Sequence, residues 1–294
     1  MSGTTELRAL MQGPLPSLYF CIGSPVVGNP TQYMMEQAFL ALDLPHRYLT
    51  CTVEKKELAS AMWGLRSLQF AGGNVTTPHK QGVMEYLDNL SETAILSHAV
   101  NCITREADGT YSGDNTDGKG FLSSLVEKSG SVEGKDVVIL GAGGAAGAIA
   151  TELVLAKARE VRIVNRTAER AVALVKRLDK ITSTQLFYEE WEGTYSIPST
   201  TDVVVQATSV GLFASTHCVD VQFPICEKQL IACDVVFNPV DTLFLKRAKQ
   251  HNCLCIDGLG MLVEQGAIAF KKWIGLEPDR NVMHKALVKA FSLG

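Results

Sequence analysis

The sequence predicts an α/β fold of two domains, in which strands and helices alternate to build parallel sheets. The chain has 294 residues, which is enough for two domains with a large core. Apolar strand-like runs alternate with helical patterns and short breaks, as in folds with parallel strands and crossover helices. A Gly-rich turn also follows an apolar run near the middle of the chain. A hydrophobic content of 46% with 20% charged residues is typical of a globular protein.

The first half begins with a predicted strand and a predicted helix. Residues 17–23 form an apolar run that ends in the turn formers Gly23-Ser24-Pro25. Residues 32–42 have apolar side chains at helical spacing. The pattern then predicts a strand over 46–53, a helix over 55–68, a turn at 72–73, a helix from 78 to 89, a further helix from 91, and a hairpin of 100–105 with 111–113.

The second half repeats the alternation. The polar stretch 127–131 precedes Gly134 and indicates an edge between the two halves. The last segment, 262–291, has a helical pattern, and we expect it to pack near the first domain. Strands are predicted over 136–140, 161–164, 202–206, 231–236 and 253–256, with helices between the earlier ones.

Charge and cysteine content exclude several classes of protein. A net charge of −4 argues against nucleic acid as the main partner. We expect no membrane span and no export signal, because no apolar run approaches the required length and residues 1–6 are not basic. The eight cysteines include no CxxC pair and are predicted to be reduced thiols of a cytoplasmic protein. No metal site is expected, since Cys253 and Cys255 have no nearby cluster of further ligands.

The Gly-rich turn predicts a dinucleotide site. Gly141 permits the tight turn after the strand, and Gly143 lets a pyrophosphate approach the backbone. Ala146 is small enough for the following helix to pack on the strand, and the N-terminus of that helix faces the anion. The residues expected to bind the cofactor here are Gly141, Ala142, Gly143, Gly144 and Ala145.

The end of the next strand favours NADP over NAD. An NAD site usually has Asp or Glu there to bind the ribose hydroxyls. This chain has Asn165, Arg166 and Thr167, with Arg170 one helical turn later. A guanidinium pairs with a 2′-phosphate, whereas a carboxylate repels it. The alternative is that the two arginines merely solvate the start of a surface helix.

Two polar segments outside the cofactor half follow predicted strands, where α/β sites usually form. One is Gly73-Asn74-Val75-Thr76-Thr77-Pro78-His79-Lys80, and the other extends from Gly113 through Asp117 to Phe121. Taken singly, Lys80 is a solvated helix residue and Asp117 is the N-cap of a helix. Neither segment alone identifies a site.

Together these motifs match a known family. The matching pieces include Asn74-Val75-Thr76-x-Pro78-x-Lys80, Ala99-Val100-Asn101, Gly113-x-Asn115-Thr116-Asp117, the Gly141 turn, Ala207-Thr208-Ser209-x-Gly211, Asn238-Pro239, and the stretch from Asp257 to Gln265. In these pieces, and in their order, the chain resembles the shikimate/quinate dehydrogenase family. The resemblance implies an N-terminal α/β substrate domain of residues 1–115 plus 265–294. It also implies a Rossmann-like NADP-binding domain of residues 116–264, and a C-terminal helix that returns to the first domain.

The resemblance also implies an activity and its residues. It assigns Lys80 and Asp117 as the catalytic pair of an NADP-dependent oxidoreductase that interconverts shikimate, or a close relative, with its 3-dehydro ketone. Such a reaction needs a proton relay at the hydroxyl while a hydride leaves the carbon. By the same resemblance, Asn101 and Gln265 bind the ring hydroxyls beside Thr76. Thr208, Ser209 and Val210 lie under the cofactor, and Gly258 and Met261 line the nicotinamide pocket. The family belongs to aromatic amino acid biosynthesis.

The residues expected to hold the substrate carboxylate depart from the family. Its two serines are replaced by Asn29 and Thr31, and its tyrosine before Asn-Pro is replaced by Phe237. Asparagine and threonine still donate hydrogen bonds, but phenylalanine does not. One interpretation is therefore a dehydrogenase that prefers a relative of shikimate, and Thr31 points weakly to quinate. The other is an ordinary shikimate dehydrogenase with equivalent contacts.

Two further hypotheses stay open. One is a non-catalytic NADP-binding regulator on the same fold, although retention of Lys80, Asp117, Asn101 and Gln265 argues against it. The other is a dehydrogenase of an unrelated small alcohol. The expected partner is a small-molecule substrate, and the sequence leaves the oligomeric state open.

Overall fold

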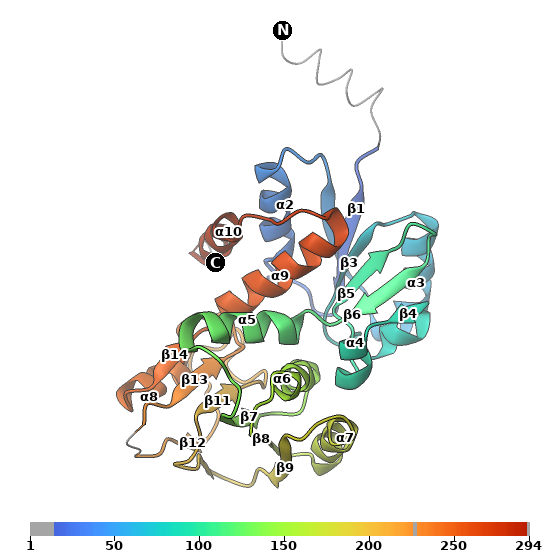
Figure 1. Ribbon diagram of the computed structural model, residues 1–294. Coiled ribbons are helices and arrows are strands. Elements are labelled where there is room, and N and C mark those ends of the chain that lie inside the picture. Colours follow the sequence, from blue (N-terminus) through green and yellow to red (C-terminus); the bar gives the residue numbers. More distant parts are fainter. Residues whose placement is uncertain (1–14, 226–227, 293–294) are drawn as a thin grey trace.

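A computed structural model describes residues 15–225 and 228–292 and contains two six-stranded sheets (Figure 1). The first sheet uses strands between Leu18 and Asp114, and the second uses strands between Asp136 and Ile256. Figure 1 shows the sheets in separate lobes, with helices α5 (Asp117–Ser129) and α9 (Gly258–Ile274) between them. The predicted α/β class is confirmed.

The first sheet is mixed rather than purely parallel. Its strands are β1 (Leu18–Gly23), β2 (Arg47–Thr52), β3 (Gly72–Val75), β4 (Asn89–Leu90), β5 (Cys102–Arg105) and β6 (Tyr111–Asp114), in the order β2-β1-β3-β5-β6-β4. β1 pairs in parallel with β2 and β3, whereas β5 is antiparallel to β3 and β6. The helices of this lobe are α2 (Thr31–Ala41), α3 (Leu58–Ser67) and α4 (Glu92–Ser97), with short 3₁₀ turns η1 (Lys55–Glu57) and η2 (Gly82–Tyr86).

The second sheet is parallel throughout. Its strands are β7 (Asp136–Leu140), β8 (Glu160–Asn165), β9 (Gln185–Glu190), β11 (Val203–Gln206), β13 (Ile231–Asp234) and β14 (Leu254–Ile256), in the order β14-β13-β11-β7-β8-β9. The strand order reverses between β7 and β11, and in open α/β sheets ligands bind at such a reversal. The other elements here are α6 (Gly144–Leu155), α7 (Ala168–Leu178), α8 (Leu243–Gln250), and the paired short strands β10 (Tyr195–Ser196) and β12 (Val221–Gln222).

Two helical contacts connect the lobes. α5 packs against α9 so closely that a Cβ at Gly120 would lie 2.5 Å from the backbone nitrogen of Gln265. The final helix, α10 (Arg280–Ser292), packs on α2, where Met283 and Leu287 share a core with Met34 and other apolar side chains. The expected return of the C-terminal segment to the first lobe is confirmed.

Several local predictions were wrong. Gly72 and Gly73 do not form a turn, because their backbone pairs with β1 and β5 on both sides. The helix predicted over 78–89 is only the turn η2, since the Lys80 carbonyl accepts the Val100 amide instead of continuing a helix. The helix predicted over 262–291 is two helices, separated where Gly275 adopts a left-handed conformation. Strand β9 was not predicted.

No helix within residues 15–225 and 228–292 is long and apolar enough to cross a membrane. Residues 1–6, on which the expected lack of an export signal was argued, lie outside the described residues.

Candidate active site

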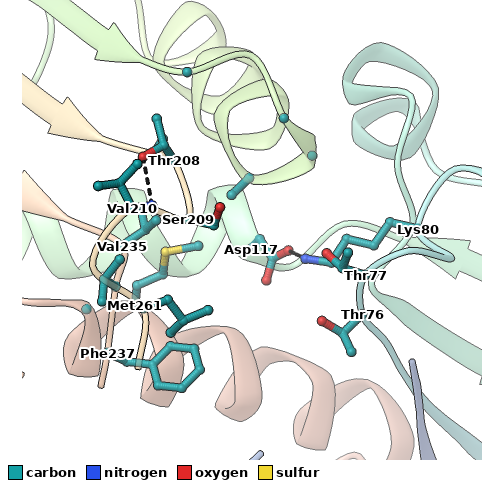
Figure 2. A pocket seen from close by; sticks show the side chains of 18 of the residues that line it. Thr76, Thr77, Lys80, Asp117, Thr208, Ser209, Val210, Val235, Phe237 and Met261 are labelled. Atoms are coloured by element: carbon teal, nitrogen blue, oxygen red, sulfur yellow. Dashed lines mark hydrogen bonds and ion pairs between the residues drawn. The ribbon is translucent and has the colours of Figure 1, made fainter. Parts of the chain in front are cut away.

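One cavity of about 900 Å³ collects nearly all the predicted site residues from both lobes (Figure 2). Its lining includes Asn29, Thr31, Thr76, Lys80, Asn101, Asp117, Gly141, Ala142, Gly143, Gly144, Ala145, Asn165, Arg166, Arg170, Thr208, Ser209, Val210, Phe237, Gly258, Met261 and Gln265. Thr167, which precedes α7, is the one predicted residue that does not line it. Residues that lie far apart in the chain therefore share one cleft.

Lys80 and Asp117 form an ion pair in this cavity. The Lys80 Nζ lies 2.5 Å from Asp117 Oδ2, and the two side chains are 19% and 10% exposed. Figure 2 shows Lys80 extending from the loop after β3 toward Asp117 at the start of α5. The pair can exchange a proton with a ligand and remains accessible to one.

Asn101 holds the oxygen of the Asp117 carboxylate that does not contact Lys80. Its Nδ2 donates to Asp117 Oδ1 at 2.8 Å and lies 3.4 Å from Gln265 Oε1, while its Oδ1 accepts the Thr116 amide at 2.7 Å. The Asp117 amide donates to the Asn115 side chain at 3.0 Å. Asn101 and Gln265 are 3% and 5% exposed, so these contacts are shielded from water. Each carboxylate oxygen of Asp117 therefore has its own partner.

The backbone on either side of Lys80 is anchored to the first sheet. His79 Nε2 lies 2.6 Å from the Val53 carbonyl, to which it donates as the protonated ring nitrogen, and the His79 side chain is buried. The Lys80 carbonyl accepts the Val100 amide at 2.7 Å. The backbone that carries the Lys80 ammonium is therefore held in place.

The Gly-rich turn has the geometry of a pyrophosphate cradle. Gly141 has φ +115°, which side-chain-bearing residues avoid, and its amide donates to the Val164 carbonyl at 2.7 Å. A Cβ at Gly143 would meet nothing within 4 Å, so the backbone is open to a ligand. Gly143 also precedes α6 without a side-chain cap, which leaves the first amides of the helix for an anion. These features fit a dinucleotide.

The basic residues after β8 are free to meet a phosphate. Arg166 and Arg170 are exposed and line the cavity, and neither has an ion-pair partner among the described residues. Asn165 turns its Nδ2 back to the Thr167 carbonyl at 2.8 Å. No acidic side chain follows β8 directly, in agreement with the predicted preference for a 2′-phosphate.

The buried side chains of Gln206 and Asp234 hold the two loops that follow strands β11 and β13. Gln206 Oε1 accepts the Thr208 amide at 2.6 Å, and Gln206 Nε2 lies 3.2 Å from Asp234 Oδ1. Asp234 also accepts the Val236 amide at 2.9 Å and the Thr242 hydroxyl at 2.7 Å. Burial raises the pKa of Asp234 to about 6, although these hydrogen bonds act in the opposite direction. The pair fixes the loops that carry Thr208–Val210 and Val235–Phe237.

Sequence reasoning missed part of the lining. The missed residues include Cys21, Asn74, Val75, Thr77, Trp191, Gly193, Cys218, Val219, Asp220, Val235 and Leu262. Val75, Trp191 and Val235 stand at or directly after the carboxyl ends of β3, β9 and β13. Counting every predicted strand end as a candidate would have pointed to Val75 and Val235, but not to Trp191, because strand β9 was not predicted. Within the described ranges, no group of three or more His, Cys, Asp or Glu side chains is placed to hold a metal ion.

Family models match most of the chain in three segments. Residues 21–103 match the shikimate dehydrogenase substrate binding domain, and residues 124–236 match the shikimate/quinate 5-dehydrogenase model. Residues 258–288 match the shikimate 5′-dehydrogenase C-terminal domain.

Individual relatives match over nearly their full length. A shikimate dehydrogenase (NADP+) of Methanocaldococcus jannaschii is 38% identical over 273 residues, covering 91% of this chain and 94% of the relative. The ligand-free 5-ketofructose reductase of Gluconobacter sp. strain CHM43 is 40% identical with a TM-score of 0.89, covering 95% and 100% of the two chains. The shikimate 5-dehydrogenase of Thermus thermophilus, in complex with NADP(H) and shikimate, is 30% identical with a TM-score of 0.80, covering 93% and 99%.

Proposed function

The chain belongs to the shikimate dehydrogenase family, and we propose that it is an NADP-dependent oxidoreductase that interconverts shikimate, or a close relative, with the corresponding 3-dehydro ketone. In the family this activity serves aromatic amino acid biosynthesis. The cavity between the lobes is the proposed site of both cofactor and substrate.

One observation supports this proposal above the others. Lys80, from the first lobe, lies against the Gly-rich turn of the second, so that a Cβ on Gly144 would be 3.6 Å from Lys80 Cδ. The ammonium paired with Asp117 is therefore next to the place where the turn receives a dinucleotide. A regulator that only binds NADP has no need of a buried proton relay at that point.

The proposed chemistry divides between the cofactor and the side chains. NADP(H) supplies the acceptor or donor of the hydride. In ketone reduction the Lys80 ammonium would donate a proton to the reacting oxygen, and in alcohol oxidation the neutral Lys80 amine would take that proton back, while Asp117 keeps the Lys80 side chain in position. Asn101 and Gln265 bind neighbouring hydroxyls from the buried side of the pocket. Thr76 lies beside them on the lining.

The proposed cofactor contacts follow the lining. Gly141–Ala145 hold the pyrophosphate, and Arg166 and Arg170 pair with the 2′-phosphate, with Asn165 and Thr167 at the same strand end. Thr208, Ser209 and Val210 line the same cavity and would contact the bound cofactor. Gly258 and Met261, at the start of α9, line the nicotinamide pocket.

Domain limits and location stay predictions. We propose a substrate domain of residues 1–115 plus 265–294 and a cofactor domain of residues 116–264, because α5 begins at Asp117 and α10 packs on the first lobe. We also propose a cytoplasmic location. Cys21, Cys102 and Cys233 are buried thiols, and burial raises the pKa of Cys21 and Cys102 to about 12, as suits inert core residues.

A second candidate function is the reduction of a keto sugar such as 5-ketofructose. The reductase of Gluconobacter that is named for it has a higher TM-score and identity with this chain than the Thermus enzyme has. The altered residues Asn29, Thr31 and Phe237 also line the cavity, at positions that the resemblance assigns to the substrate.

The test is a substrate panel of shikimate, quinate and 5-ketofructose with NADP(H) and with NAD(H), followed at the nicotinamide absorbance band. We expect turnover with the phosphorylated cofactor on at least one of the three. Binding of NADPH without turnover on any of them would favour the regulator instead.

A further inference from the structure

The substrate end of the cavity lacks a cation that could neutralise a carboxylate. Among the described residues, the basic side chains of the lining are Lys80, Arg166 and Arg170. Arg166 directly follows β8 and Arg170 lies in the first turn of α7, both in the cofactor half. Lys80 already holds Asp117 at 2.5 Å, so the two charges compensate each other. An anionic substituent would rely on neutral donors alone, as it does with the two serines and the tyrosine of the family, so its binding depends on how many of these donors the chain keeps.

The side-chain amide of Asn29 has only its nitrogen left to bind a ligand. Its Oδ1 accepts the Thr31 amide at 2.9 Å, which fixes the side chain at the start of α2. Its Nδ2 is 3.7 Å from Cys21 Sγ, a weak acceptor that leaves donor capacity unused. The Thr31 hydroxyl has no hydrogen-bond partner among the described residues, although Thr31 is 5% exposed. An amide and a hydroxyl of this kind match alcohol groups, which donate and accept hydrogen bonds, and carbonyl groups, which only accept them.

Phe237 supplies an apolar wall on the lining of the same cavity. Its ring centroid lies 6.5 Å from that of Phe213, at right angles, and 5.8 Å from that of Phe291 in α10. Figure 2 shows Phe237 and Met261 on the side of the pocket opposite Thr76. A carboxylate placed against this wall would lose water without gaining a charge-assisted hydrogen bond. A C–H or hydroxymethylene group would lose much less hydration free energy at the same place.

We propose that Asn29, Thr31 and Phe237 are specificity-determining residues that select uncharged polyhydroxylated ketones and alcohols over ring carboxylates. The proposal rests on the proposed function, because it concerns the same oxidoreductase site. It assigns these three residues to the recognition of hydroxyl and carbonyl groups, and Lys80 and Asp117 to the reacting oxygen in either case.

The test compares shikimate with its carboxamide, which has nearly the same shape and no charge. We expect kcat/KM with NADP+ to be about tenfold or more higher for the carboxamide, with most of the difference in KM, because this group is remote from the reacting carbon. A kcat/KM for shikimate equal to or above that of the carboxamide would overturn the proposal. Lack of turnover on both compounds, on quinate and on 5-ketofructose would instead overturn the proposed oxidoreductase function, and the specificity proposal with it.

Variants provide the second arm of the test. Phe237→Tyr, alone and with Asn29→Ser, adds hydroxyl donors at the wall, and we expect it to lower the KM for shikimate more than the KM for the carboxamide, because a hydrogen bond to a charged acceptor is the stronger one. The matched control is Phe213→Tyr, which adds the same hydroxyl to the neighbouring exposed ring outside the lining. An equal change in KM for both compounds, or the same change in the control, would contradict the assigned roles.

Discussion

Lys80 and Asp117 are 37 positions apart in the chain, yet Lys80 Nζ lies 2.5 Å from Asp117 Oδ2. The contact joins the loop after β3 to the first residue of α5. Because Asn101 takes the other carboxylate oxygen at 2.8 Å, the geometry of the pair is determined from both sides. A proton relay needs this kind of fixed geometry at the reacting oxygen.

Lys80→Met and Asp117→Asn should each lower kcat by about two orders of magnitude or more, the usual contribution of a positioned proton-transfer group. The double variant should lose little more, because the two groups act as a unit. Steady-state turnover on the best substrate of the panel measures this. Lys128→Met, on the exposed end of α5, is the control and should keep the parent rate. Retention of near-parental turnover by either single variant would remove that residue from the mechanism.

Arg166→Ala should weaken NADP by about ten- to hundredfold and leave NAD nearly unchanged, since a charge-assisted hydrogen bond to the 2′-phosphate is lost. Titration of both cofactors by fluorescence or calorimetry measures the two dissociation constants. Lys176→Ala removes an exposed cation on helix α7, which follows Arg166, and should change neither constant. An equal loss for NADP and NAD would show that Arg166 does not meet the 2′-phosphate.

Gly120→Ala should destabilise the protein by about 1–3 kcal/mol, because its Cβ would meet the Gln265 backbone, 2.5 Å away, at the α5–α9 contact. Since Gln265 lines the substrate pocket, we also expect a higher KM for the substrate. Chemical denaturation and steady-state kinetics measure the two effects. The exposed helix position Ser123→Ala serves as control and should have little effect on either. Unchanged stability of the Gly120 variant would mean that the two helices can separate without cost.

Asp234 should give the protein a pH-dependent component of stability. Its pKa in the folded state, about 6, is higher than the ordinary value of 3.8, so the folded protein binds the proton more tightly than the unfolded chain. The protonated carboxyl therefore stabilises the fold at low pH, and this contribution is lost as the pH rises from about 4 through 6. Relative to Asp234→Asn, the free energy of unfolding should fall over that window by up to about 3 kcal/mol.

Denaturation of the parent and of Asp234→Asn at a series of pH values measures that difference. Asp241→Asn, with an exposed side chain on the same connection, is the control. A difference between the parent and Asp234→Asn that is constant with pH would show that the pKa of Asp234 is the same in the folded and the unfolded protein.

The sequence determined the parts of the site that depend on local pattern. The turn from Gly141 to Ala145 and the arginines after β8 were singled out from the sequence, because a strand, a turn and a helix follow one another along the chain, and these residues line the cavity. The alternation of strands and helices also identified the α/β class. These features need only short-range backbone preferences and the burial of apolar faces.

Only the tertiary structure decided the features that depend on distant segments. Gly72 and Gly73 have turn-like composition, but pairing with β1 and β5 makes them a strand. The ammonium of Lys80 and the carboxylate of Asp117 meet only when the loop after β3 and the start of α5 come together in the folded chain, although several elements separate them in the sequence. The sequence likewise showed that Phe237 had replaced a tyrosine, but not that its ring packs on Phe213 and Phe291. Such contacts arise from the packing of whole elements, and no local pattern in the chain encodes them.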